Sequence, residues 1–171
     1  MSRKSRRHAL KSSDTKTLLS KAAGTLGINL NELIDSKATV EAIETGRGEL
    51  LLVDKEPLLF RTRETVYPTL MFAEIVTKLP KVVVDMGAVR HVCNGAGVMA
   101  PGIVHYEGDF RKGELVLVVD MKFGKPLALG EAQYDSEATK SIKRGVVVKN
   151  IHFVSDEIWN AIKALGEKVE K

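Results

Sequence analysis

The chain has 171 residues, of which 44% are hydrophobic and 28% are charged, a balance typical of one globular domain or of two small ones. Its single cysteine, Cys93, excludes an internal disulfide framework and a multi-cysteine zinc site, and it fits a reducing compartment. No apolar run approaches the roughly 20 residues of a membrane span, and the N-terminal stretch lacks the apolar core of a secretory signal. We therefore expect a cytoplasmic protein without membrane contact.

The net charge of +4 is concentrated at the N-terminus. Residues 1–16 hold six basic residues and one acidic residue, whereas the rest of the chain holds 20 basic and 21 acidic residues. A basic, serine-rich arm of this kind attracts polyanions such as nucleic acid, although a merely solubilising tail has the same composition. We expect residues 1–12 to form a flexible tail.

The first half of the chain predicts a small α+β domain over residues 13–79. A helix capped by Ser13 or Asp14 carries apolar residues at helical spacing and ends at Gly27, and a shorter helical piece follows at residues 29–35. The segments 39–44, 49–54 and 57–63 are rich in branched apolar residues and predict strands of a meander. The segment 67–79 predicts a helix entered through Pro68 and ended before Pro80.

The second half predicts a small closed or nearly closed β-barrel over residues 80–160, followed at 161–171 by the end of a C-terminal helix. Residues 81–85 form a continuous apolar run typical of a buried strand, and residues 87–95 predict a short helix. Four more strand-like segments follow, with a helical piece between the last two, and a final helix begins near residue 156. The strand-like segments cover residues 98–106, 114–121, 126–134 and 145–153.

Several motifs in this second half resemble those of a PUA domain, a pseudo-β-barrel module of proteins that handle structured RNA. They are VVVDMGAVRHVCNGAGVMAPGI, then LALGEA, then RGVVVKNIHFVSDEIW. The residue types of the family pattern are all present, at Asp85, Gly87, Ala88, Gly95, Ala96, Met99, Pro101, Gly102, Ile103, Gly145, Val147, His152, Asp156 and Trp159. The resemblance implies an α+β protein with a PUA pseudo-barrel.

The junction LLFRTRETVYPTLMFAEIVTKLPKVVVDMGAV is similar to that of the malignant T-cell-amplified sequence family, and the resemblance implies an archaeal-type member of it. That family places a small α+β domain before the PUA domain and resembles the amino-terminal part of ligatin. The resemblance implies a role in translation, contact with the small ribosomal subunit and a partner like the density-regulated protein. It also implies that Arg61, Arg63 and Tyr67 make ribosome or partner contacts; a solvated strand edge is an equally good interpretation of the two arginines.

The stretch NGAGVMAPGI crowds three glycines and one proline into ten residues. Glycines let a backbone approach a ligand closely, and the resemblance to PUA domains implies that the helix, this turn and the neighbouring strands hold single-stranded RNA. A plain structural turn is the alternative. On the short helix, Arg90 and Asn94 stand four residues apart on the face opposite the apolar one, and form the expected polar rim. The expected floor is Gly95, Ala96, Gly97 and Met99, and the expected phosphate contacts are Lys122, Lys125, Lys143, Arg144 and Lys149.

Catalysis finds little support in the sequence. The four histidines lack metalloprotease spacing, no G-x-S-x-G elbow is present, and Pro101 is incompatible with a dinucleotide fingerprint. About 79 preceding residues are too few for a catalytic domain of typical size. We expect no enzyme activity, no catalytic residues, no metal and no cofactor.

The resulting hypothesis is an RNA-binding protein of the translation machinery that holds the 3′ acceptor end of a tRNA near the small ribosomal subunit, in initiation, reinitiation or recycling. Two alternatives remain open. One is an RNA-targeting accessory subunit of an RNA-modification enzyme, and the other is a protein-interaction scaffold without RNA binding.

Overall fold

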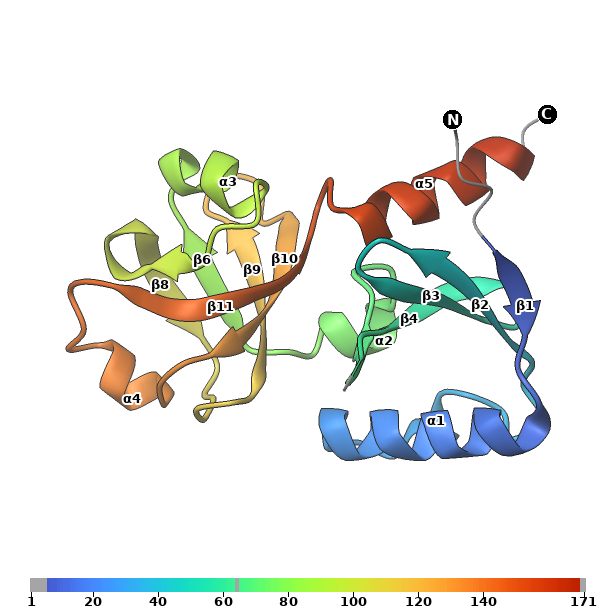
Figure 1. Cartoon of the computed structure of the whole chain (residues 1–171). Coiled ribbons are helices and arrows are strands. Elements are labelled where there is room, and N and C mark those ends of the chain that lie inside the picture. The colour runs from blue at the N-terminus through green and yellow to red at the C-terminus, as the bar shows by residue number, and fades with distance from the viewer. Residues whose placement is uncertain (1–5, 64, 170–171) are drawn as a thin grey trace. The chain divides into compact units, whose positions relative to one another are not determined.

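The computed structural model describes residues 6–63 and 65–169 (Figure 1). The chain forms two compact units: the first comprises the residues up to Glu74 together with those from Glu157 onward, and the second comprises Ile75–Asp156. The α+β class expected from the sequence is confirmed, because each unit combines a mainly antiparallel sheet with helices.

The first unit is built on a five-stranded antiparallel sheet in the order β1-β2-β3-β4-β5. Its central strand carries the run Leu50–Val53, in which all four side chains are buried. Successive side chains of a strand point to opposite faces, so both faces of this sheet must be covered. Two helices do this: α5 (Glu157–Val169) packs on β2 and β3, and α1 (Ser12–Leu26) lies on the opposite side (Figure 1). The strands are β1 (Arg7–Ala9), β2 (Val40–Thr45), β3 (Gly48–Val53), β4 (Glu56–Arg61) and β5 (Val66–Pro68).

The C-terminal helix belongs to the first unit. The sequence suggested a domain boundary at residue 160 and a separate helix end at 161–171, but α5 is one continuous helix whose strand contacts are with β2 and β3. Its apolar residues, including the buried Ile158, recur at helical spacing and provide the face that covers the sheet.

The N-terminal arm differs from the flexible tail expected over residues 1–12. Residues 1–5 lie outside the described residues, but Arg7–Ala9 form β1, which pairs with β2. The Arg7 guanidinium donates to a Glu41 carboxylate oxygen at 2.5 Å, and this hydrogen bond lowers the pKa of Glu41. Backbone pairing and this ion pair hold the end of the arm on the sheet edge. The first helix begins at Ser12 with Lys11 as its N-cap, so neither Ser13 nor Asp14 caps it.

The helix expected over residues 67–79 is much shorter. Tyr67 and Pro68 belong to the edge strand β5, and only Ala73–Val76 form a helix, α2. Phe60 on β4 contacts the Tyr67 ring at a centroid distance of 5.4 Å. Pairing with β4 therefore overrides the helical pattern of this segment. In the first unit a short helix, η1 (Leu30–Glu32), lies where the sequence predicted a helical piece.

The second unit is a half-barrel of six strands in the order β7-β11-β10-β9-β6-β8, antiparallel except for the parallel pair β6 and β9. The edge strands β7 and β8 are joined by only three residues, η2 (Ala100–Gly102), so the two sheet edges meet at this link. A mainly valine core fills the interior. The strands are β6 (Lys81–Val84), β7 (Val98–Met99), β8 (Ile103–Glu107), β9 (Leu115–Asp120), β10 (Pro126–Ala132) and β11 (Val146–Phe153); the helices are α3 (Met86–Val92) and α4 (Ser136–Thr139).

Candidate nucleic-acid interface

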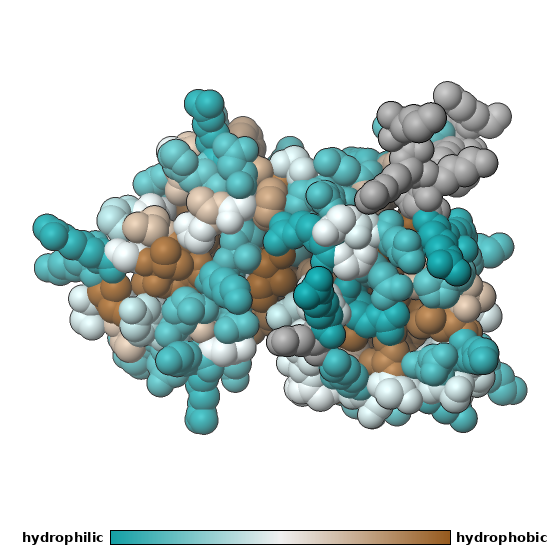
Figure 2. Space-filling model, viewed as in Figure 1, coloured by the Kyte–Doolittle hydropathy of each residue, from teal (hydrophilic) through white to brown (hydrophobic). Residues whose placement is uncertain are grey.

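A crevice of about 530 Å³ opens in the second unit where α3, η2, β7 and the start of β11 meet. This volume lies within the range of about 300–1,000 Å³ typical of small-ligand sites. Figure 2 shows apolar surface open to solvent on the unit that carries β11. Met99 and Val146, which line the crevice, are 49% and 43% exposed. The lining residues are Asp85, Gly87, Ala88, His91, Val92, Ala96, Gly97, Val98, Met99, Pro101, Gly102 and Val146.

Asp85 fixes the start of α3 beside the crevice. Its carboxylate accepts a hydrogen bond from the Ala88 backbone N–H at 2.8 Å, the arrangement of a helix N-cap. Its own backbone N–H donates to the carbonyl of Gly102 at 2.9 Å. One residue therefore ties α3 to the far side of the glycine turn (residues 94–103), and the crevice lies between them.

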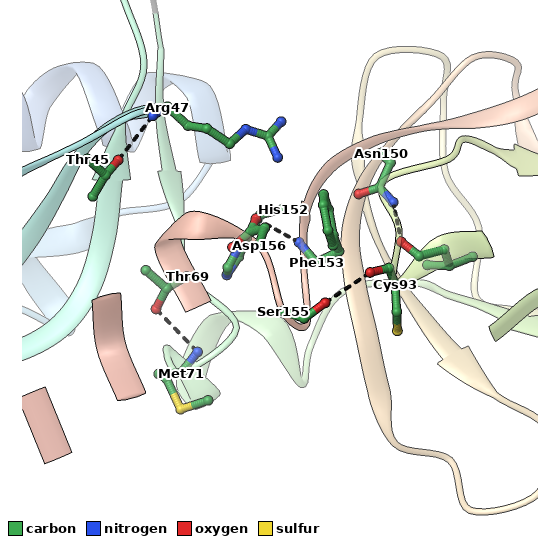
Figure 3. Close-up of polar contacts among 11 residues, drawn as sticks. Thr45, Arg47, Thr69, Met71, Cys93, Asn150, His152, Phe153, Ser155 and Asp156 are labelled. Carbon is green, nitrogen blue, oxygen red and sulfur yellow. Dashed lines mark hydrogen bonds and ion pairs between the residues drawn. The ribbon is translucent and has the colours of Figure 1, made fainter. Parts of the chain in front are cut away.

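Asn150 holds the near end of the same turn on β11. Its amide Nδ2 donates to the carbonyls of Val92 and Ala96, both at 3.0 Å. The hydroxyl of Ser155 donates to the Cys93 carbonyl at 3.0 Å (Figure 3). Side chains of β11 and of the residues after it therefore satisfy three carbonyls at the end of α3 and in the turn that follows it. These bonds keep the turn in one position relative to the strand.

The glycines of the turn are explained first by packing within the protein. Gly95 has a φ of +90°, and a Cβ there would lie 3.1 Å from the Phe153 ring. At Gly97 a Cβ would lie 2.8 Å from Val146 Cγ1 and 3.2 Å from the Val148 carbonyl oxygen. Both Cβ positions would lie against residues of β11, so the absence of a Cβ lets the turn pack directly on this strand. The crevice exists beside the turn because of this close approach.

Two titratable residues near the glycine turn, Cys93 and His152, have roles in packing and hydrogen bonding within the protein. Burial raises the pKa of the Cys93 thiol, which favours the neutral, unreactive form. His152 is fully buried, and its Nδ1 lies 2.8 Å from a carboxylate oxygen of Asp156 (Figure 3). The same carboxylate accepts the backbone N–H of Phe153 at 3.1 Å. The pair therefore closes the turn that ends β11.

The residues predicted to form the floor and rim are only partly brought together. Ala96, Gly97 and Met99 line the crevice, whereas Gly95 packs on Phe153. Arg90 and Asn94 are exposed but do not line the crevice. Of the residues between them in sequence, His91 and Val92 line it.

The basic residues predicted to contact phosphates occupy three places in the second unit. Lys143 and Arg144 are exposed immediately before Gly145, whose carbonyl accepts the Ala100 N–H at 2.9 Å, so they lie beside the crevice. Lys149 is exposed on β11 and stands opposite Glu131 on β10, which offsets its charge.

Lys122 and Lys125 lie in the turn between β9 and β10, which we call the β9–β10 hairpin (residues 121–125). The Asp120 carboxylate accepts backbone N–H bonds from Lys122, Phe123 and Lys125 at 2.9, 2.5 and 3.0 Å. These bonds, led by that from Phe123, lower the pKa of Asp120 and keep it ionised. The hairpin is therefore a well-defined basic loop.

In the first unit the three predicted ribosome or partner contacts have different environments. Arg61, the last residue of β4, forms an ion pair with Glu49 through Nε at 2.7 Å, and its side chain is 34% exposed. Arg63 is exposed in the bend after β4, and Tyr67 is half-buried against Phe60. Arg63 is therefore the one of the three most available to a partner.

Sequence reasoning missed three features of the site. Val146 lines the crevice although it lies more than 40 residues after α3, and no local pattern indicates that β11 pairs with β7. His91 could have been found, because it neighbours Arg90 on the same helix. Phe123 between two predicted phosphate ligands was overlooked as well. Within residues 6–63 and 65–169 no group of three or more His, Cys, Asp or Glu side chains is placed to hold a metal ion.

Two family models match successive parts of the chain. One, described as a PUA domain, matches residues 80–154, and the other, described as a Pre-PUA-like domain, matches residues 2–76. The chain belongs to the PUA-domain family. The PUA match corresponds to the second unit and the Pre-PUA match to most of the first, so the resemblance and the two-domain architecture inferred from the sequence are confirmed.

In the alignments with curated relatives, the matched residues make up similar shares of this PUA protein and of the relative. A protein of Methanocaldococcus jannaschii is 41% identical over 135 residues, which are 77% of this chain and 82% of the relative. Translation machinery-associated protein 20 of Saccharomyces cerevisiae is 32% identical over 142 residues, 77% of each chain. Malignant T-cell-amplified sequence 1 of Rattus norvegicus is 31% identical over 137 residues, 77% of this chain and 75% of the relative. The chain is thus related to translation-machinery proteins and to an archaeal protein.

A solved structure supports the fold. A protein of Pyrococcus horikoshii matches with a TM-score of 0.73 and 34% identity over 92% of this chain and 99% of that one. In the part of the PUA protein that the structure describes, no helix combines the length and apolar character needed to cross a bilayer.

Proposed function

We propose that this PUA protein is a non-enzymatic, cytoplasmic RNA-binding adaptor of the translation machinery. In this proposal the crevice holds the unpaired 3′ acceptor end of a tRNA near the small ribosomal subunit. The first unit, with Arg63 exposed, contacts the ribosome or a partner resembling the density-regulated protein. Membership of the PUA family and similarity to Translation machinery-associated protein 20 support the wider role.

The single observation that carries the proposal is the crevice itself. Its lining is mainly apolar, and Met99 and Val146 offer exposed apolar surface to a base. Single-stranded RNA is recognised by such contacts with splayed bases, whereas an A-form duplex hides its major groove. Lys143 and Arg144 beside the crevice would neutralise the phosphates that accompany the bases.

The charge of the second unit predicts modest affinity. Residues 75–156, which form this unit, contain eleven basic and nine acidic residues, so its net charge is only +2. Binding must therefore depend on the local basic residues and on contacts inside the crevice. Each phosphate neutralised on a single strand contributes a slope of about −0.7 to the logarithm of affinity against the logarithm of salt concentration.

The proposal is tested by filling the crevice. Ala96→Trp places a bulky ring at an exposed lining position, while Ala138→Trp places the same ring at an exposed position on α4 and serves as the control. We expect the first variant to lose at least about tenfold in affinity for tRNA, the loss of roughly one base contact, and the control to bind as the unchanged protein does. Binding that is equal in both variants and the unchanged protein, or that shows no salt dependence, would contradict the proposal. The second result would favour a protein-interaction scaffold.

A further inference from the structure

The β9–β10 hairpin exposes a large apolar side chain. Phe123 is 65% exposed, and Met121 beside it is 52% exposed. Among the described residues of the second unit, Phe123 is the most exposed aromatic ring. The phenyl ring of Phe123 has no polar atom that water could hydrate, so its exposure loses the stabilisation that burial of the ring would give. The protein nevertheless keeps this ring at the tip of a loop.

The loop that carries Phe123 is held rigidly. The Asp120 carboxylate accepts the Phe123 N–H and two neighbouring N–H groups, and the Gly124 N–H donates to the Asp120 carbonyl at 3.1 Å. Gly124 has a φ of +63°, which a residue with a side chain rarely adopts. These bonds hold the backbone of the loop in place, so a ligand that binds here does not have to order the loop, and this lowers the entropic cost of binding.

Two lysines lie close to the ring. The ammonium groups of Lys122 and Lys125 lie over the Phe123 ring, 5.1 and 5.8 Å from its centroid. Both distances are within the roughly 6 Å of a cation–π contact, and Phe123 is nevertheless 65% exposed. A base that stacks on the ring would take the place of these ammonium groups, which long, flexible side chains can move to nearby phosphates.

The hairpin lies at the same end of the half-barrel as α3 (Figure 1), and residues of α3 line the crevice. Strands β6 and β9 run parallel, with Val84 beside Asp120, and the Met121 N–H donates to the Val84 carbonyl at 2.9 Å. The next residue, Asp85, lines the crevice. The start of the hairpin is therefore bonded to the residue that precedes the edge of the crevice.

We infer that Phe123 is a stacking platform for an unpaired base, and that Lys122 and Lys125 bind the phosphates next to that base. This inference rests on the proposed function, because the platform extends the same RNA site beyond the crevice. An exposed aromatic with adjacent cations is the combination by which proteins bind single strands independently of sequence. A membrane surface also binds apolar loops with lysines, but its affinity grows with the buried apolar area, and this tip offers only Phe123 and Met121.

The test uses the full chain and a fluorescently labelled single-stranded RNA oligonucleotide. Phe123→Ala is compared with Phe123→Trp, which keeps an aromatic face, and with Tyr134→Ala, which removes an exposed ring after the opposite end of β10. We expect Phe123→Ala to bind roughly 5- to 100-fold more weakly, the loss of one base–aromatic stack, with an unchanged salt slope. Phe123→Trp and Tyr134→Ala should bind as the unchanged protein does. Replacing Lys122 or Lys125 by Ala should reduce the slope by about 0.7 each.

The outcomes separate this inference from the proposed function. Unchanged RNA affinity in Phe123→Ala, with affinity lost in Ala96→Trp, would overturn the platform and leave the crevice as the RNA site. No RNA binding by the unchanged protein would overturn both. Loss of binding to phosphatidylcholine–phosphatidylserine vesicles in Phe123→Ala, with RNA binding unaffected, would overturn the platform in favour of a membrane contact.

Discussion

The packing of the glycine turn on β11 can be tested by Gly97→Ala. The new Cβ would lie 2.8 Å from Val146 Cγ1 and 3.2 Å from the Val148 carbonyl oxygen, whereas ordinary contacts are about 3.5–4.0 Å. Relieving this overlap by moving the turn costs about 1–3 kcal/mol, as overpacking usually does. The gain of up to about 1 kcal/mol from stiffening the unfolded chain is smaller. We therefore expect net destabilisation of the PUA domain.

The assay is a double-mutant cycle with Val146→Ala, followed by thermal and urea unfolding. Val146 is 43% exposed, so its truncation alone should cost less than about 1 kcal/mol. The double variant removes Cγ1 and should recover most of the loss, giving a coupling of about 0.5–3 kcal/mol. Each kcal/mol corresponds to a shift in Tm of roughly 4–8 °C for a domain of about this size.

Gly95→Ala is the matched control. Its φ of +90° strains any residue with a side chain, and its neighbour is Phe153, so Val146→Ala should not rescue it. Additive effects of Gly97→Ala and Val146→Ala would refute the packing argument, as would an equal rescue of Gly95→Ala.

Three further predictions concern the supports and rim of the crevice. Asn150→Ala removes the donors to the Val92 and Ala96 carbonyls and should lower the free energy of unfolding by about 1–3 kcal/mol in urea titrations; a loss below 0.5 kcal/mol would argue against the anchoring role. The pKa of Asp120 is lower in the folded than in the unfolded chain, so its stabilisation is complete above the ordinary value of 3.8 and is lost as the pH falls through the folded value. Asp120→Asn should therefore flatten this acid limb of the stability curve, and an identical limb would contradict the assignment. Arg90→Glu, on the exposed face of α3, should weaken tRNA binding and reduce the salt slope by about 0.7 without changing Tm, and equal affinity would remove this helix face from the site.

Local patterns predicted most of the secondary structure. The first helix ends at Gly27 as expected, with a φ of +64°, because a left-handed terminator is a property of a single residue and its neighbours. The apolar run before Asp85 forms a buried strand for a similar reason, since its valines favour extended backbone. Such signals depend little on the rest of the chain.

Features set by distant contacts could not be predicted. The helix α5 packs in the first unit because the buried run Leu50–Val53 must be covered on both faces of the sheet. No residue near this run in the sequence indicates which helix covers it. Arg7–Ala9 form a strand only because β2 offers a free edge. Tyr67 and Pro68 join a sheet although their surroundings show a helical pattern, since pairing with β4 decides their conformation.

The candidate site shows the same division. The glycine turn and α3 were found from sequence because their residues are contiguous, and Ala96, Gly97 and Met99 do line the crevice. Val146 escaped notice because only the pairing of β11 with β7 brings it there. The role proposed for Phe123 rests on its exposure and on the hydrogen bond that its N–H donates to Asp120, and neither can be inferred from the sequence.

The central claim is that the crevice grips the unpaired end of an RNA. It is tested most directly by comparing the affinity of the full chain for intact tRNA with its affinity for tRNA trimmed of the unpaired 3′-terminal nucleotides. We predict that trimming weakens binding by at least about tenfold, because stacking contacts of about 1–3 kcal/mol per base are lost. Equal affinity for the two RNAs would contradict the claim.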